Sequence, residues 1–139
     1  MLAEQARADL CAAAGTRGWS DDPALLAPRL TDWRGRHTGA AALLLRPDST
    51  AAVQAIVRAA ARHRVPIVPQ GGNSGMVAGA TPDTSGASVL LSLERLNRIR
   101  SIDPAGQTLT AEAGVVLDQV HAAAAEHGLA FPLTLGAHG

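Results

Sequence analysis

The segment Val65–Pro82, which reads VPIVPQGGNSGMVAGATP, decides how the whole chain is interpreted. It opens with an apolar run at residues 65–68 that predicts a buried strand, and it continues as a loop with glycines at positions 71, 72, 75 and 79. At the carboxyl end of a parallel strand, the backbone N–H groups of such a loop can surround an anion, because glycine permits positive φ and close approach. Asn73 and Ser74 can add side-chain donors. The segment therefore predicts a phosphate-binding loop, with a flexible connector as the alternative.

Spacing and composition exclude several phosphate-binding enzymes. The loop matches neither GxGxxG nor GxxxxGK followed by Ser or Thr, so a dinucleotide-binding Rossmann fold and a P-loop do not fit. The chain has twelve arginines and no lysine, which excludes a P-loop lysine, a Schiff-base lysine and a Tyr/Lys pair. The single cysteine, Cys11, excludes an intramolecular disulfide and a cysteine-based zinc site, and we expect it to be a small buried hydrophobe.

The rest of the sequence predicts helices that alternate with short strands. Apolar residues at helical spacing predict helices over residues 2–14, 50–64 and 116–127. Short apolar or alternating runs predict strands at 41–45, 65–68 and 89–91 and a hairpin of 99–103 with 108–113. Strand, helix and strand over residues 41–68 are typical of a βαβ unit with parallel pairing. Residues 16–39 predict an irregular arm, and residues 129–139 predict an extended end.

Charge and hydropathy limit the partners. The formal net charge is zero and only 2% of the residues are aromatic, which argues against nucleic-acid binding. The apolar runs are far shorter than the roughly 20 residues that a membrane-spanning helix needs. The first fifteen residues lack the apolar core of a secretory signal, and the cysteine count suits a reducing compartment, so we expect a cytoplasmic protein.

The histidines and the remaining charged residues indicate no catalytic or metal site. No two of the five histidines have HxH or HxxxH spacing. We expect His63 and His127 to close helices, where the helix dipole favours a positive charge, and His121 to pair with Asp118. We expect the remaining cluster of charged residues to lie on a solvent-exposed face: Glu94, Arg95, Arg98 and Arg100.

Several segments together resemble one protein family. The run at residues 65–82 is similar to the pyrophosphate loop of FAD-linked oxidases of the vanillyl-alcohol oxidase/PCMH type. The nearest branch is that of the D-2-hydroxyacid dehydrogenases, which includes D-2-hydroxyglutarate dehydrogenase, D-lactate dehydrogenase and the glycolate oxidase flavin subunit. DWRGR at 32–36 and RPDST at 46–50 resemble the pre-domain element and the strand-to-helix turn of this family. Residues 93–103, 112–115 and 131–137 follow in family order, so the resemblance covers almost the whole chain from Asp32 onward.

The resemblance implies an α+β fold with α/β-type subdomains, namely the N-terminal part of a PCMH-type FAD-binding domain. Residues 1–40 would form an N-terminal helix and an irregular arm, and residues 41–139 a partial FAD-binding domain. Within it, residues 41–98 would be a first subdomain with a small parallel βαβ sheet and helices. Residues 99–139 would begin an incomplete second subdomain, with FAD between the two.

The resemblance also implies which residues hold FAD. In the loop these are Pro69, Gln70, Gly71, Gly72, Asn73, Ser74, Gly75, Met76, Gly79 and Ala80, and nearer the flavin they are Pro132, Leu133 and Thr134. Asn73 stands where some relatives carry a histidine that attaches the flavin, so we expect FAD to be bound non-covalently. Three residues depart from the family pattern: Ser74 replaces threonine, Thr134 replaces aspartate, and Ala78 replaces a glycine. The methyl group of Ala78 is tolerable only if φ there is negative.

The implied activity is that of an FAD-dependent oxidoreductase acting on CH–OH groups. It would oxidise a small D-2-hydroxy acid by hydride transfer to flavin N5, and this chain would supply cofactor binding but no catalytic residue and no metal ligand. The family continues past residue 139, so we expect a fragment that is inactive alone and depends on a C-terminal domain or a partner chain. The alternative is a non-catalytic module, either a deflavo remnant or a subunit that docks onto a separate flavoprotein. A third reading, an unrelated phosphate-binding α/β domain, predicts that a mononucleotide binds as well as FAD.

Overall fold

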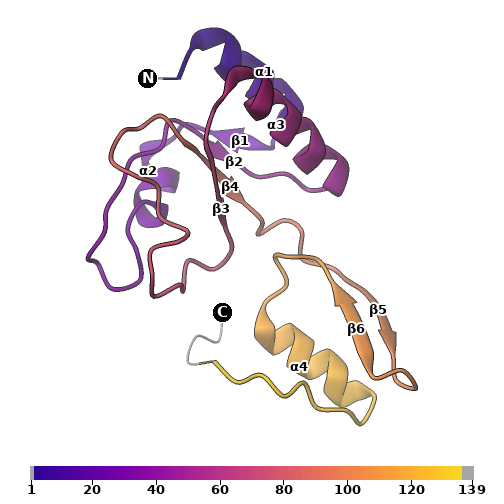
Figure 1. Cartoon of the computed structure of the whole chain (residues 1–139). Helices are drawn as coiled ribbons and strands as arrows, with labels where there is room; N and C mark the ends of the chain where they lie inside the picture. The colour runs from indigo at the N-terminus through magenta and orange to yellow at the C-terminus, as the bar shows by residue number, and fades with distance from the viewer. Residues whose placement is uncertain (1, 136–139) are drawn as a thin grey trace.

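The computed structural model describes residues 2–135, which fold into two parts that follow each other along the chain (Figure 1). The sheet part, residues 2–98, is built on a four-stranded sheet. The hairpin part, residues 99–135, contains a two-stranded hairpin and one helix. Helices combined with a small mixed sheet confirm the predicted α+β fold class.

The sheet has the order β1-β2-β4-β3, with β1 at Trp19–Ser20, β2 at Leu44–Leu45, β3 at Ile67–Gln70 and β4 at Val89–Ser92. Strands β2 and β3 both run parallel to β4, and β1 is antiparallel to β2. The predicted direct pairing of β2 with β3 is therefore wrong, because β4 lies between them. The arm adds the antiparallel strand β1 to the predicted parallel strands, so the sheet as a whole is mixed.

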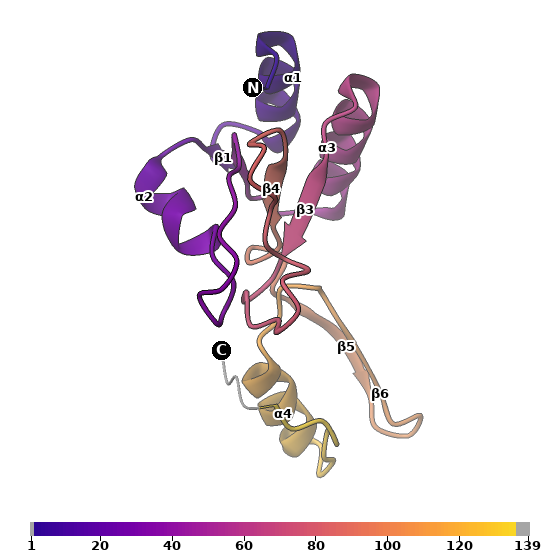
Figure 2. The ribbon, with the colours of Figure 1, turned by 60° about the vertical axis from the view of Figure 1, so that its left-hand side comes forward.

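Helices α1 (Glu4–Ala14) and α3 (Thr50–His63) lie side by side over one face of the sheet (Figure 2). Their apolar stripes and the inward side chains of the sheet form the main core, which consists of Leu10, Leu43, Leu45, Ile56, Ala59, Ala60, Val89 and Leu91. Cys11 packs against this core as predicted, but it is only partly buried. The buried members of this core are all aliphatic, and Trp19 of β1 packs against them as a partly buried side chain.

The predicted irregular arm contains regular structure. Besides β1 it forms α2 (Pro23–Leu26) and a 3-10 helix, η1 (Ala27–Arg29). Asp22 caps α2 by accepting a hydrogen bond from the Ala24 N–H at 2.9 Å, and Pro23 suits the first helical position, where no N–H donor is needed. Leu26 then packs on the second face of the sheet against Leu44 and Leu90.

The hairpin part comprises β5 (Ile99–Asp103), β6 (Thr108–Ala111) and α4 (Leu117–Glu126). It is joined to the sheet part at Gly114, whose N–H donates to the Leu96 carbonyl at 2.8 Å. A Cβ at residue 114 would lie 1.9 Å from the Leu93 carbonyl oxygen, so only glycine allows this close crossing. Gly128 follows α4 with φ of 69°, the left-handed conformation in which a glycine commonly ends a helix.

Residues 2–135 contain neither a candidate membrane span nor a candidate metal-binding cluster. No helix within residues 2–135 is long and apolar enough to cross a membrane. The same range holds no group of three or more His, Cys, Asp or Glu residues placed to bind a metal ion. Residues 136–139, which include the predicted motif residues Gly136 and Ala137 and the last histidine, His138, lie outside the described residues.

Candidate functional site

The glycine loop, residues 71–80, follows β3 at the carboxyl end of the parallel strands (Figure 2). Pro69 and Gln70 belong to the strand itself rather than to the loop. Seven of the ten loop residues are exposed, the exceptions being Asn73, Ala78 and Ala80. The loop therefore lies where ligands of open α/β sheets bind, with most of its backbone accessible.

The loop glycines leave open space beside the backbone. A Cβ built on Gly71, Gly72, Gly75 or Gly79 would meet no atom within 4 Å. None of these four glycines has positive φ, so the prediction that the loop needs glycine for its backbone angles is wrong. The structure itself would accept a methyl group at all four positions. What the glycines provide is an unobstructed approach to the N–H groups, which fits a diphosphate that backbone amides bind directly.

Two other loop residues have left-handed backbone angles. φ is 52° at Asn73 and 56° at Ala78. Asparagine tolerates this region, whereas alanine is strained there by roughly 1–2 kcal/mol. The condition placed on Ala78, a negative φ, is therefore not met. Ala78 thus has the left-handed conformation that suits a glycine, and the strain comes from its Cβ methyl group.

The side chain of Gln70 joins the loop to the arm. It is 2% exposed, and its Nε2 donates to the Arg29 carbonyl at 2.9 Å and to the Ala80 carbonyl at 3.0 Å. The Nδ2 of Asn73 donates to the Thr31 carbonyl at 2.8 Å. Both amides were predicted as cofactor-binding residues, and both side chains are directed to backbone carbonyls of this chain.

Asp32 fixes the part of the arm beside the loop. Its buried carboxylate accepts hydrogen bonds from the backbone N–H groups of His37 and Arg36, each at 2.7 Å, and from that of Arg34 at 3.4 Å. The His37 amide, followed by those of Arg36 and Arg34, holds the pKa of Asp32 below its usual value against the opposing effect of burial. The arm thus presents a rigid turn to the loop, with Trp33 exposed on it.

The predicted solvated face is confirmed at Arg98 and Arg100, which are exposed, but Glu94 and Arg95 are partly buried. Glu94 receives the Nε of Arg46 on one carboxylate oxygen and the Nη2 of Arg29, at 2.8 Å, on the other. Burial acts to raise the pKa of Glu94, but the hydrogen bonds from Arg29 and Arg46 outweigh it and lower the pKa. The prediction failed at Glu94 because the two arginines come from segments distant in sequence.

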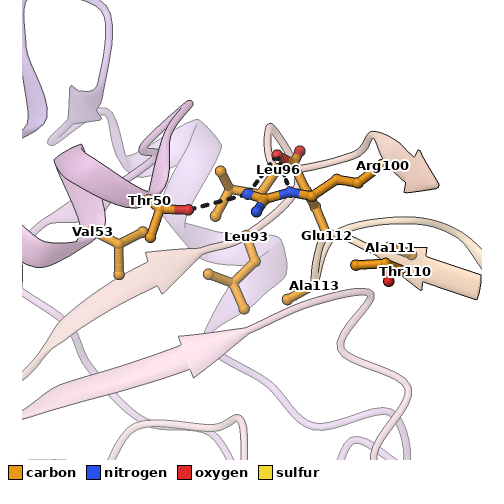
Figure 3. A pocket seen from close by; sticks show the side chains of 9 residues that line it. All are labelled: Thr50, Val53, Leu93, Leu96, Arg100, Thr110, Ala111, Glu112 and Ala113. Atoms are coloured by element: carbon orange, nitrogen blue, oxygen red, sulfur yellow. Dashed lines mark hydrogen bonds and ion pairs between the residues drawn. The ribbon is translucent and has the colours of Figure 1, made fainter.

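Arg98 and Arg100 also form ion pairs, at the junction of the two parts. The carboxylate of Glu112, whose side chain is 3% exposed, accepts from the Arg98 N–H at 3.1 Å, the Arg98 Nη2 at 3.3 Å and the Arg100 Nη2 at 3.1 Å. Arg100 also donates to the Thr50 hydroxyl at the start of α3 (Figure 3). Leu93, Leu96 and neighbouring residues line a cavity of about 340 Å³ at this place. Arg100 therefore links the hairpin to the sheet part.

The flavin-side residues Pro132, Leu133 and Thr134 lie in the exposed segment after α4. The Leu133 carbonyl lies 2.8 Å from the Nε2 of His121, a contact that the sequence does not indicate. Among the described residues, no hydrogen bond joins this segment to the glycine loop. The structure thus groups the loop residues at one site and leaves the other three on the hairpin part.

His63 makes a contact that the sequence analysis missed. It ends α3 as predicted, but its Nε2 also lies 2.8 Å from the Asp9 carboxylate of α1. The hydrogen bond from His63 is the largest cause of the lowered pKa of Asp9, followed by that from Gln5. The contact fastens the two helices to each other, and it lies outside the loop site.

Comparison with known proteins assigns the family. Residues 41–139, the greater part of the chain, match the family model described as an FAD binding domain. The chain belongs to this FAD binding domain family. The resemblance seen in the sequence is thereby confirmed.

Relatives of this FAD binding domain carry the names that the resemblance suggested. A probable mitochondrial D-2-hydroxyglutarate dehydrogenase of Oryza sativa subsp. indica is 40% identical over 108 residues, covering 78% of this chain and 19% of the relative. A D-2-hydroxyglutarate dehydrogenase of Xanthomonas citri pv. viticola is 39% identical over 118 residues, covering 85% and 25%. A putative mitochondrial D-lactate dehydrogenase of Schizosaccharomyces pombe is 36% identical over 120 residues, covering 86% and 22%. The FAD binding domain described here spans about a fifth to a quarter of these relatives.

Solved structures agree on the fold of this FAD binding domain. p-Cresol methylhydroxylase superposes with a TM-score of 0.75 at 25% identity, covering 90% of this chain and 25% of that one. 6-Hydroxy-D-nicotine oxidase from Arthrobacter nicotinovorans gives 0.70 at 28% identity, covering 84% and 25%. The predicted PCMH-type fold is confirmed.

Proposed function

We propose that the glycine loop holds the diphosphate of FAD and that the chain is the cofactor-binding portion of a flavoprotein that oxidises a small D-2-hydroxy acid. The observation that carries this proposal is the open space beside Gly71, Gly72, Gly75 and Gly79 on a loop that follows a parallel strand. The names of the relatives supply the substrate class. Because the chain spans only a fraction of their length, we expect a further domain or a partner chain to supply the groups that bind and deprotonate the substrate.

The proposed site is the set predicted from the sequence. The amides of the loop would hold the diphosphate, and Pro132, Leu133 and Thr134 would approach the flavin from the hairpin part. When bound, the flavin supplies the two-electron acceptor for oxidation of the hydroxy acid. The division into an arm at 1–40, a first subdomain at 41–98 and a second from 99 onward is part of the proposal, with FAD between the last two.

The electrostatics of the loop favour a ligand that is bound by backbone dipoles. Residues 69–82 contain no charged side chain. A cradle of backbone N–H groups binds an anion without a cationic side chain. Because no side chain of the loop changes its charge with pH, we expect the loop's contribution to FAD affinity to be independent of pH.

We further propose that FAD is bound without a covalent bond. Residue 73 is asparagine, whose amide cannot attach a flavin and already donates to the Thr31 carbonyl. Acid precipitation of the loaded chain should therefore release all flavin into the supernatant. Flavin that stayed in the protein pellet would contradict this.

The proposal is tested by reconstituting the full chain with FAD and measuring flavin absorbance and fluorescence after gel filtration. Gly72→Val should abolish retention, since its side chain fills the space that the diphosphate would occupy. Ala105→Val adds bulk to an exposed turn of the hairpin and should leave retention unchanged. Failure of the unaltered chain to retain FAD, or equal retention by Gly72→Val, would refute the proposal. Equal affinity for AMP and FAD would favour a general phosphate-binding domain instead.

The cellular compartment is a proposal as well. The single cysteine suits a reducing compartment, and we propose the cytoplasm. Several relatives are named as mitochondrial, so the location of this chain is to be decided by fractionation of its source cells.

A further inference from the structure

Gln70 closes the glycine loop on itself. The residue precedes the loop, and its side chain donates to the carbonyl of Ala80, the last loop residue. A glutamine amide has two N–H donors, and the second reaches the Arg29 carbonyl. Since Gln70 is 2% exposed, water cannot replace these bonds. Three segments therefore depend on one buried amide: the end of β3, the end of the loop and the end of η1.

Asn73 makes a second attachment within the same loop. Its amide donates to the Thr31 carbonyl, two residues beyond Arg29 on the arm. The left-handed backbone at Asn73, with φ of 52°, accompanies this contact. The exposed residues Gly71 and Gly72 are thus flanked on both sides by residues whose side chains bind the arm.

The arm is itself held from its other side. Arg29 pairs with Glu94 at the end of β4, and Glu94 also binds Arg46 at the end of β2. The Thr31 hydroxyl lies 3.0 Å from that of Thr38, where the two residues form an isolated β-bridge. The carbonyls that receive the amides of Gln70 and Asn73 therefore belong to a fixed piece of backbone.

We propose that Gln70 and Asn73 are positioning residues that hold the loop backbone in its open shape before the cofactor arrives. The inference rests on the proposed function. It assigns the two side chains to contacts with the arm, so that the backbone N–H groups of the loop bind the diphosphate. A loop that already has the bound shape loses less conformational freedom on binding. If the loop were released, the apparent affinity would equal the intrinsic affinity multiplied by the fraction of time that the loop spends in the open shape.

The main test compares Gln70→Met with Gln54→Met in the full chain. Methionine has nearly the shape of glutamine but no donor, and Gln54 is exposed on α3, so the second variant controls for the chemical change. We expect Gln70→Met to weaken FAD binding about tenfold, equivalent to 1.4 kcal/mol, and Gln54→Met to leave it unchanged. Amide hydrogen exchange in the FAD-free chain should be faster at residues 71–75 in Gln70→Met than in Gln54→Met.

A pH series separates positioning from a general loss of folding. Gln70→Glu places an acceptor opposite two carbonyl oxygens when ionised, but the protonated acid can donate one hydrogen bond. Burial disfavours the charged form and raises the pKa of a carboxyl group at this position, so the affinity of Gln70→Glu for FAD should recover as the pH falls from about 8 to about 5.5, while that of Gln70→Met stays low throughout.

The outcomes distinguish the two proposals. If the unaltered chain binds FAD but Gln70→Met binds it equally well, the positioning role is refuted and the proposed function stands. If the unaltered chain binds no FAD, the proposed function fails, and the amide exchange still tests the attachment of the loop. Exchange at residues 71–75 that is equal in Gln70→Met and Gln54→Met would overturn the inference.

Discussion

Replacing Leu10 by alanine tests whether the N-terminal helix belongs to the core that supports the site. Leu10 lies on α1, is 0% exposed, and belongs to the same cluster as Ile56 of α3 and the inward residues of β2 and β4. Residues 1–40 were predicted to form an N-terminal helix and an irregular arm. The structure places Leu10 of that helix inside the packing of the sheet part.

The size of the effect follows from that burial. Leu10→Ala removes three carbon atoms, each worth about 0.8 kcal/mol of transfer free energy, or about 2.4 kcal/mol in all. The surrounding helices and strands cannot collapse fully into the space, which adds a cavity cost and brings the total to about 3–4 kcal/mol. Since a domain has only about 5–15 kcal/mol of stability, this variant should lose a large share of its free energy of unfolding.

The assay is urea denaturation followed by far-UV circular dichroism, with Val77→Ala as the control. Val77 is 89% exposed, so its truncation should change the free energy of unfolding by less than about 0.5 kcal/mol. The reasoning is refuted if Leu10→Ala costs no more than Val77→Ala, because α1 would then be a detachable appendage.

Three further predictions use the same measurement. Ser49→Ala removes the cap on the Ala52 N–H and should cost about 1 kcal/mol; an unchanged midpoint would contradict the capping role. The pKa of Glu112 is lowered chiefly by the Arg98 N–H, so its contribution to stability is present above the ordinary value of 4.5 and is lost as the pH falls through the lowered value. Glu112→Gln should remove this acid sensitivity, whereas Glu126→Gln on an exposed position should retain it. Ala78→Val should destabilise the chain by about 1 kcal/mol and Ala78→Gly should not, because φ there is positive; equal effects would argue against the strain.

The sequence predicted the elements that depend on local pattern. The stripe of Val53, Ile56 and Ala60 predicted α3, and the apolar runs predicted β2, β3 and β4 within two or three residues. The order of the strands was not predictable from these patterns, since nothing local indicates that β4 lies between β2 and β3. Strand β1 was missed because two residues carry no detectable period.

The candidate site, too, was predictable only where the signal is local in sequence. The glycine loop was recognised from its composition and its place after a strand. The roles of Gln70 and Asn73 were not, because their acceptors are backbone carbonyls of Arg29 and Thr31, and any residue has a carbonyl. One signal was present, a glutamine at the end of an apolar strand, since a buried amide must find partners.

Pro69 gives the sheet a protected border. Strand β3 is the last strand of the described sheet, and residues 66 and 70 direct their carbonyls toward β4. Because the backbone alternates, Pro69 directs its backbone away from β4, where an N–H donor would otherwise be available to another strand. Pro69, a residue predicted to touch the cofactor, thus also removes a hydrogen-bond donor from this edge, which disfavours strand addition by a second molecule.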